Sequence, residues 1–99
     1  MSIRMVRAKV KADKVADLEK AAGEMFAAIE AVGPQGVRYA SCKLPDGETF
    51  VILLALDDDE NNPLVVVPAF RDFQDNIRNW IAEPPAAELL TPIGSYRLF

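Results

Sequence analysis

The sequence contains no histidine, and this absence excludes several kinds of site at once. Histidine is the side chain that titrates near neutral pH, the commonest metal ligand in proteins and the proximal ligand of many haem irons. Histidine-based triads, His-ligated metal centres and haem held by a proximal histidine are therefore excluded. The single cysteine, Cys42, cannot form an internal disulfide, so we expect a protein of the reducing cytoplasm.

Long apolar segments and basic runs are missing as well. Asp57 and Pro63 interrupt the longest apolar stretches, so no segment reaches the length that a membrane span needs. Residues 1–14 alternate and lack the apolar region and cleavage site of a signal peptide. The chain has 15 acidic and 11 basic residues, and this net charge of −4 is unfavourable for binding nucleic acid or anionic membranes. We expect neither as a partner.

The 99 residues suffice for one domain, residues 1–99, and their hydrophobic pattern indicates alternating strands and helices. Strands are predicted over 2–10, 36–43, 48–56 and 93–99, and helices over 12–32 and from near Pro68 to Pro84. Asp13 is the expected N-cap of the first helix, which Gly33 ends. Asp46 and Gly47 predict a tight turn. Residues 86–90 are expected to add a helical turn, and 64–67 fit either a connector or a helical turn.

This order of elements predicts an α+β, ferredoxin-like βαββαβ fold, a four-stranded antiparallel sheet with both helices on one face. The third strand is central and is apolar at every position from Phe50 to Leu56. Burial of four aliphatic side chains on its second face is worth roughly 6 to 12 kcal/mol. That is about the whole stability of a small domain. We therefore predict a homodimer whose sheets face each other around an enclosed chamber.

The order of elements, the bare sheet face and the stretch FRDFQDNIRNW resemble the antibiotic biosynthesis monooxygenase (ABM) domain proteins of the dimeric α/β-barrel superfamily. The similarity covers essentially the whole chain. It implies a dimeric α/β barrel that acts as a cofactor-independent monooxygenase on an aromatic, quinol-like small molecule. The same resemblance allows a non-catalytic barrel that binds an apolar ligand or serves as a scaffold.

Individual residues can be compared with the family's motifs. The anthrone oxygenases of this family use an Asn-x-x-x-Trp pair, which Asn76 and Trp80 match, and Arg97 corresponds to their arginine near the last strand, although its spacing differs. Their tyrosine six residues after the tryptophan is Ala86 here, a departure. Haem-degrading members need a histidine ten residues after the tryptophan, where this chain has Leu90. Haem degradation is therefore disfavoured.

The implied chemistry needs no metal or flavin, because the enolate of an electron-rich substrate reduces O₂ itself. The protein supplies an apolar cavity and donors for the developing oxyanion. The catalytic candidates are Asn76, Trp80 and Arg97, and the substrate-binding candidates are Tyr39, Tyr96, Arg38 and Phe73. No pattern identifies the proton acceptor, and Asp72, one helical turn before Asn76, is a hypothesis for it.

Each candidate also has an ordinary structural explanation. Trp80 lies at helical spacing with Phe73 and is typical of a core residue, and Asn76 has the charged neighbours of a surface position. The strand order also matches that of an RNA-binding RRM domain. That alternative lacks the aromatic RNP pattern and has the wrong net charge.

Overall fold

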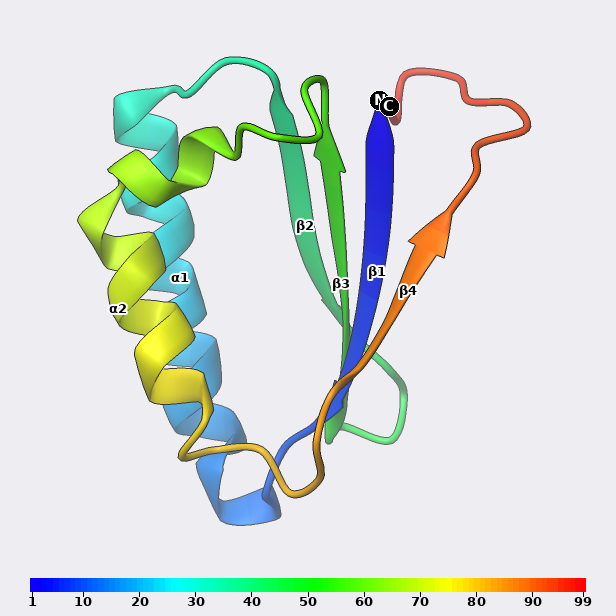
Figure 1. Ribbon diagram of the computed structural model, residues 1–99. Helices are drawn as coiled ribbons and strands as arrows, with labels where there is room; N and C mark the ends of the chain where they lie inside the picture. The colour runs from blue at the N-terminus through cyan, green and yellow to red at the C-terminus, as the bar shows by residue number, and fades with distance from the viewer.

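A computed structural model describes all 99 residues and shows a four-stranded sheet with both α-helices on one of its faces (Figure 1). The elements are β1 (Ser2–Lys9), η1 (Ala12–Lys14), α1 (Val15–Val32), β2 (Val37–Lys43), β3 (Thr49–Leu56), η2 (Pro63–Val66), α2 (Pro68–Ile77) and β4 (Ala86–Leu90). The sheet has the order β2-β3-β1-β4, and neighbouring strands are antiparallel. The predicted ferredoxin-like fold, with the first and third strands central, is confirmed.

Helix α1 has an apolar stripe that packs on the sheet. Leu18 and Met25, two turns apart, are only 2% and 1% exposed. The helix ends as predicted at Gly33, which adopts a left-handed φ of 64° and donates its N–H to a carbonyl of the last turn, 2.8 Å away. Its start differs from the prediction: Asp13 lies within η1, and Lys14 holds the N-cap position without a side-chain hydrogen bond.

The hairpin between β2 and β3 is closed by the predicted Asp46-Gly47 turn. Gly47 has a φ of 76°, which favours glycine. The Asp46 carboxylate accepts hydrogen bonds from the backbone N–H groups of Glu48 and Thr49, both at 2.9 Å, and from the Thr49 hydroxyl at 2.6 Å. These bonds lower the pKa of Asp46 to about 2, because each of them favours the ionised carboxylate.

The core lies between the sheet and the helices. Alternate residues of a strand face the same side, so Phe50, Ile52 and Leu54 of β3 all point toward the helices. The fully buried cluster comprises Val10, Leu18, Met25, Phe50, Leu64, Val67, Phe70 and Phe73. Helix α2 contributes Phe70 and Phe73, one turn apart, after Pro68 at its first position.

Helix α2 is shorter than predicted, because the chain after it pairs with the end of β1. The helix ends at Ile77, and the carbonyl of Trp80 accepts a hydrogen bond from the N–H of Lys11 at 2.8 Å. Ile81 then forms an isolated bridge with Val10. The N–H groups of Trp80 and Ile81 still donate to the carbonyl of Ile77, but the carbonyl of Trp80 bonds to Lys11 and does not continue the helix.

The last strand was predicted wrongly. Residues 86–90, expected as a helical turn, form β4, and residues 93–99, expected as a strand, form neither helix nor strand. The high helix propensity of Ala, Glu and Leu favoured the helical interpretation. Antiparallel pairing with β1, from Ile3 opposite Leu90 to Arg7 opposite Ala86, overrides that propensity.

The sheet face away from the helices is covered in part by the end of the same chain. Residues 91–99 return toward the N-terminus on this side of the sheet (Figure 1). Ile3 and Ala55, paired across β1 and β3, are each only 2% exposed, whereas Leu53 of the same face is half-buried. The expectation of an entirely bare face is thus wrong at one end.

Neither helix has the length and apolar character that crossing a membrane requires.

Candidate functional site

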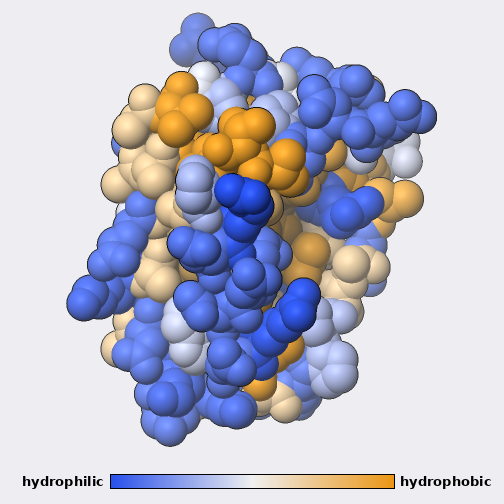
Figure 2. Space-filling view, turned by 60° about the vertical axis from the view of Figure 1, so that its left-hand side comes forward, coloured by the Kyte–Doolittle hydropathy of each residue, from blue (hydrophilic) through white to orange (hydrophobic).

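The apolar hollow that best fits a small molecule lies between the sheet and α2. It has a volume of about 390 Å³, in the range of small-molecule sites, and its lining is mostly hydrophobic. The lining residues are Val6, Ala8, Tyr39, Ile52, Phe73, Gln74, Ile77, Arg78, Ile81 and Pro85. We call this hollow the helix-side cleft. In Figure 2, hydrophobic side chains lie recessed among hydrophilic ones on the side of the molecule that carries the helices.

The floor of the helix-side cleft is closed by the packed core. Below it, between α1 and the sheet, a void of only about 10 Å³ remains. This is about the smallest volume that can hold one water molecule. A ligand therefore rests on the core, against Tyr39, Ile52 and Phe73, which line both the cleft and the void.

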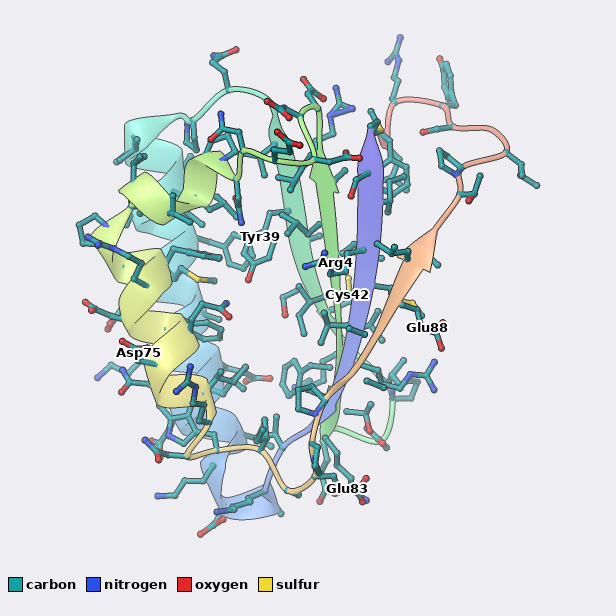
Figure 3. All side chains as sticks on the ribbon, viewed as in Figure 1. Arg4, Tyr39, Cys42, Asp75, Glu83 and Glu88 are labelled. Atoms are coloured by element: carbon teal, nitrogen blue, oxygen red, sulfur yellow. The ribbon has the colours of Figure 1, made fainter.

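Tyr39 is the most distinctive polar residue of the cleft. Figure 3 shows it projecting from β2 toward the helices. Its ring stacks on Phe26, with centroids 5.2 Å apart, and meets Phe70 edge-on at 5.8 Å. Removal of its hydroxyl from water raises the pKa of Tyr39 to about 12. The hydroxyl is therefore a neutral hydrogen-bond donor at physiological pH, and it makes none of the side-chain hydrogen bonds within the protein.

Of the other predicted residues, Phe73 on α2 lines the cleft, and Trp80, which follows the helix, supports it. Phe73 is 7% exposed and forms part of the wall. Trp80 is half-buried outside the cleft, with its ring edge-on to Phe73 at a centroid distance of 6.2 Å. Trp80 can influence a ligand through Phe73, because the two rings are in contact.

Asn76 and Trp80 do not lie on one helical face. Asn76 is exposed on α2, and the helix ends one residue later, so the i to i+4 relationship with Trp80 is broken. Asp72, the hypothetical proton acceptor, is also exposed and lines no part of the cleft. None of the predicted catalytic residues lines the cleft, and the roles of Asn76 and Trp80 stay predictions.

The remaining predicted residues lie on the opposite face of the sheet. Arg38 and Arg97 line a second hollow, of about 340 Å³, together with Ala40, Leu53 and residues near the C-terminus. Arg97 has a φ of 61° and its guanidinium lies 5.2 Å from the centre of the Tyr96 ring. Tyr96 is 83% exposed and lines neither hollow. Tyr39 lines both hollows, so the structure separates Arg38 and Arg97 from Phe73 but not from Tyr39.

Sequence reasoning missed several residues of the helix-side cleft, among them Val6, Gln74 and Arg78. It placed the ligand chamber between two facing sheets, whereas this cleft lies on the helix side. The alternation of β1 could have indicated Val6, which points to the same side as Ala8 and Val10. The helical pattern predicts that Gln74 and Arg78 face solvent, and only the tertiary structure shows that they line the cleft.

The electrostatics of the cleft differ from those of the chain as a whole. The chain is acidic, yet none of its 15 Asp and Glu residues lines the cleft, and Arg78 is the charged residue there. The hydrogen-bond donors available to a ligand are Tyr39, Gln74 and Arg78. No group of three or more His, Cys, Asp or Glu side chains is placed to hold a metal ion.

Comparison with known proteins gives a consistent picture of the fold. A structure named as a candidate antibiotic biosynthesis monooxygenase of Nitrosomonas europaea is 20% identical, with a TM-score of 0.79, over 95% of this chain and 100% of that one. A second such candidate, from Caulobacter crescentus, is 20% identical with a TM-score of 0.74, over 94% and 90% of the two chains. A NIPSNAP domain protein of Burkholderia xenovorans is 20% identical with a TM-score of 0.65, over 93% and 94%.

Comparison of the amino-acid sequence with protein families and curated proteins finds no match. Structural likeness at 20% identity demonstrates a shared fold and not a shared activity. The resemblance seen in the sequence is thus confirmed as a likeness of fold, and this chain has the ferredoxin-like fold of the structures named as antibiotic biosynthesis monooxygenases.

Proposed function

We propose that this protein binds a small aromatic molecule in the helix-side cleft and oxygenates it with O₂. The observation that carries the proposal is the position of Tyr39, a neutral phenol at the edge of an apolar hollow large enough for a small ligand. The fold shared with structures named as antibiotic biosynthesis monooxygenases supports the same class of activity.

The reaction balances without a cofactor when the substrate supplies all the electrons. An anthrone-like substrate R₂CH₂ reacts with O₂ to give R₂C=O and H₂O. The carbon loses two hydrogens and gains one oxygen atom, and the second oxygen atom leaves as water. The step requires a carbanion or enolate, so the site must favour the ionised form of the substrate.

The residues of the cleft can favour an ionised substrate. The Tyr39 hydroxyl donates a hydrogen bond to the developing enolate oxygen, and Arg78 supplies a positive charge at the cleft wall. Aromatic and aliphatic walls exclude water and strengthen both interactions. Asn76, Trp80 and Arg97 remain catalytic predictions that the residues of the cleft do not require.

A second function, ligand binding without turnover, is favoured by one observation. Neither a carboxylate nor a histidine lines the cleft, so no side chain there is a suitable proton acceptor near neutral pH. Oxygenation then depends on a substrate acidic enough to lose its proton to water. A ligand without such a proton binds in the cleft and is released unchanged.

Oxygen consumption separates the two functions. The assay measures O₂ uptake by the purified protein with a panel of anthrones and hydroquinones. We expect Tyr39→Phe to lower kcat by on the order of 100-fold, the loss typical of one oxyanion donor. Arg71→Gln, an exposed change on α2 away from the cleft, is the matched control and should keep full activity. Uptake by the natural protein that is no faster than that of Tyr39→Phe refutes the oxygenase. An Asn76→Ala, Trp80→Phe double variant tests separately whether those two residues contribute to catalysis.

We also propose that the protein is a homodimer in which two sheets pack face to face. Met5, Val51 and Leu53 lie on the sheet face away from the helices and are half-buried in the single chain. Residues 91–99 cover only one end of this face. Apolar surface of this kind is typical of a protein interface. A dimer would enclose the second hollow, with Arg38 and Arg97, at or near the contact between the copies.

A further inference from the structure

One arginine lines the helix-side cleft, a second lies on the same face of the sheet, and neither forms a salt bridge. Arg78 lines the cleft directly, at the C-terminal end of α2. Arg4 is on β1, two residues before Val6, and alternation places both on the helix side of the sheet. Figure 3 shows Arg4 extending from β1 toward the side on which Tyr39 lies.

The strand register places Arg4 level with Tyr39. Leu54 of β3 pairs with Tyr39 on one side and with Arg4 on the other. Because neighbouring strands lie about 4.8 Å apart, the Cα atoms of Tyr39 and Arg4 are separated by roughly 10 Å across β3. A flat ring system resting on Ile52, two residues before Leu54 on the same face of β3, would thus have the Tyr39 phenol on the β2 side and the Arg4 guanidinium on the β1 side.

Neither arginine has an acidic partner in the structure. The two salt bridges join Lys14 to Asp17 and Lys43 to Glu19, and both lie away from the cleft. Arg4 and Arg78 are exposed, so they are free to contact a ligand at the rim. In a chain of net charge −4, the one charged residue that lines the cleft is a cation, Arg78, so the charge of the cleft is opposite to that of the whole chain.

Guanidinium groups recognise carboxylates in a specific geometry. Their parallel N–H groups form two hydrogen bonds to the two oxygens of one carboxylate, and such charge-assisted bonds are about twice as strong as neutral ones. The walls of the cleft bind the apolar part of a ligand but do not distinguish an acid from an alcohol. The two arginines can distinguish an acid from an alcohol, because only the acid carries a negative charge.

We propose that the ligand of the helix-side cleft is an aromatic carboxylate, with its rings between Ile52 and Phe73 and its carboxylate on Arg78 within the field of Arg4. This inference rests on the proposed function only in that both use the same cleft. It names the class of ligand, whether or not the ligand is oxygenated.

Direct binding tests the inference with two matched fluorescent probes. Anthracene-9-carboxylate and anthracene-9-methanol share one ring system and differ in charge. Each is titrated with the protein, and its Kd is measured from the change in fluorescence. We expect the carboxylate to bind at least about tenfold more tightly than the alcohol, as a single charge-assisted contact suggests. Arg78→Gln and Arg4→Gln should each reduce this preference, and the double variant should abolish it, with little change in the Kd of the alcohol.

Three controls test whether the carboxylate of the probe binds at Arg78 and Arg4. Arg71→Gln, on the exposed surface of α2, should leave both Kd values unchanged. Raising the salt concentration should weaken binding of the carboxylate, but not of the alcohol, in the unaltered protein, which tests the charge without any substitution. Equal affinity for the two probes overturns the inference. Loss of the preference in Arg38→Gln, on the other sheet face, also overturns it, because the carboxylate then binds there.

The outcome is independent of turnover. A carboxylate preference that depends on Arg4 and Arg78, without O₂ uptake, supports this inference and refutes the oxygenase. Oxygen uptake with neutral quinols, together with equal affinity for the two probes, supports the oxygenase and refutes this inference.

Discussion

The ring of Tyr39 stacks on that of Phe26, with the centroids 5.2 Å apart and the ring planes inclined by 27°. Tyr39 belongs to β2 and Phe26 to α1, so this contact joins the edge of the sheet to the first helix. A phenol held between apolar rings loses water from around its hydroxyl, and ionisation becomes unfavourable. The same packing therefore stabilises the fold and keeps a neutral donor at the cleft.

The raised pKa of Tyr39 predicts a loss of stability in alkaline solution. The folded protein holds this proton until the pH approaches 12, whereas the unfolded chain releases it near 10. The contribution is fully present below pH 10, and it decreases as the pH rises from 10 to 12. Two pKa units correspond to a loss of about 2 to 3 kcal/mol in the free energy of unfolding.

Urea unfolding at several pH values measures this loss. The unfolding midpoint of the natural protein should decrease from pH 9 to pH 12 more steeply than that of Tyr39→Phe, which has no phenolic proton. Tyr96→Phe removes a phenol that is 83% exposed and serves as the matched control, because it should retain the natural slope. Parallel curves for Tyr39→Phe and the natural protein would contradict the prediction.

The fold could be predicted largely from the sequence, because its strongest signals are periodic. The apolar run of β3, the spacing of Leu18 and Met25 in α1, and the Asp46-Gly47 turn each determine local structure with few alternatives. The end of α2 and the identity of β4 could not be predicted in the same way. Pairing with β1 determines both, and a local pattern does not show that pairing.

The site was harder to predict, because its residues come from separate elements. Tyr39 and Phe73 were selected from the sequence and line one cleft. The sequence did not indicate Arg78, because a charged residue in a helical segment is normally expected to face solvent. Only the tertiary structure shows that it lies opposite the sheet. Arg97 was selected for a strand position that it does not occupy, since residues 93–99 form no strand.

The lowered pKa of Asp46 predicts a second pH dependence, in acid. The pKa of Asp46 in the folded protein is about 2, below the ordinary value of 3.8 for an aspartate, so the turn contributes stability above pH 4. That contribution should be lost as the pH decreases from 4 to 2, when the carboxylate is protonated. Asp46→Ala removes the acceptor of three hydrogen bonds, so this variant should show a smaller decrease in stability over the same range.

The control for Asp46→Ala is the removal of a carboxylate that accepts no hydrogen bonds in a turn. Asp59 is exposed in the loop after β3, and Asp59→Ala should retain the natural acid profile. Urea midpoints at pH 2, 3, 4 and 7 give the three profiles. If Asp46→Ala and Asp59→Ala behave alike, the hydrogen bonds of the turn are not the cause of the acid dependence.

The dimer proposal predicts that a charge at the centre of the open sheet face will separate the copies. Leu53 lies on β3, between Met5 of β1 and Ala40 of β2 in the register, and it would be buried against the second sheet. Leu53→Lys places an ammonium group in that contact beside Arg38 and Arg97, which line the same hollow, so the buried charge has no acidic partner there and costs several kcal/mol. A loss of that size should shift a micromolar sample from dimer to monomer, as measured by light scattering after size-exclusion chromatography.

Val65→Lys is the matched control, because Val65 is 51% exposed on η2, away from the open face. It adds the same charge to an apolar position and should leave the mass of the dimer unchanged. Circular dichroism shows whether Leu53→Lys is still folded. A natural protein that is folded and monomeric at micromolar concentration would refute the dimer. In that case residues 91–99 must protect the open face well enough for the single chain to remain in solution.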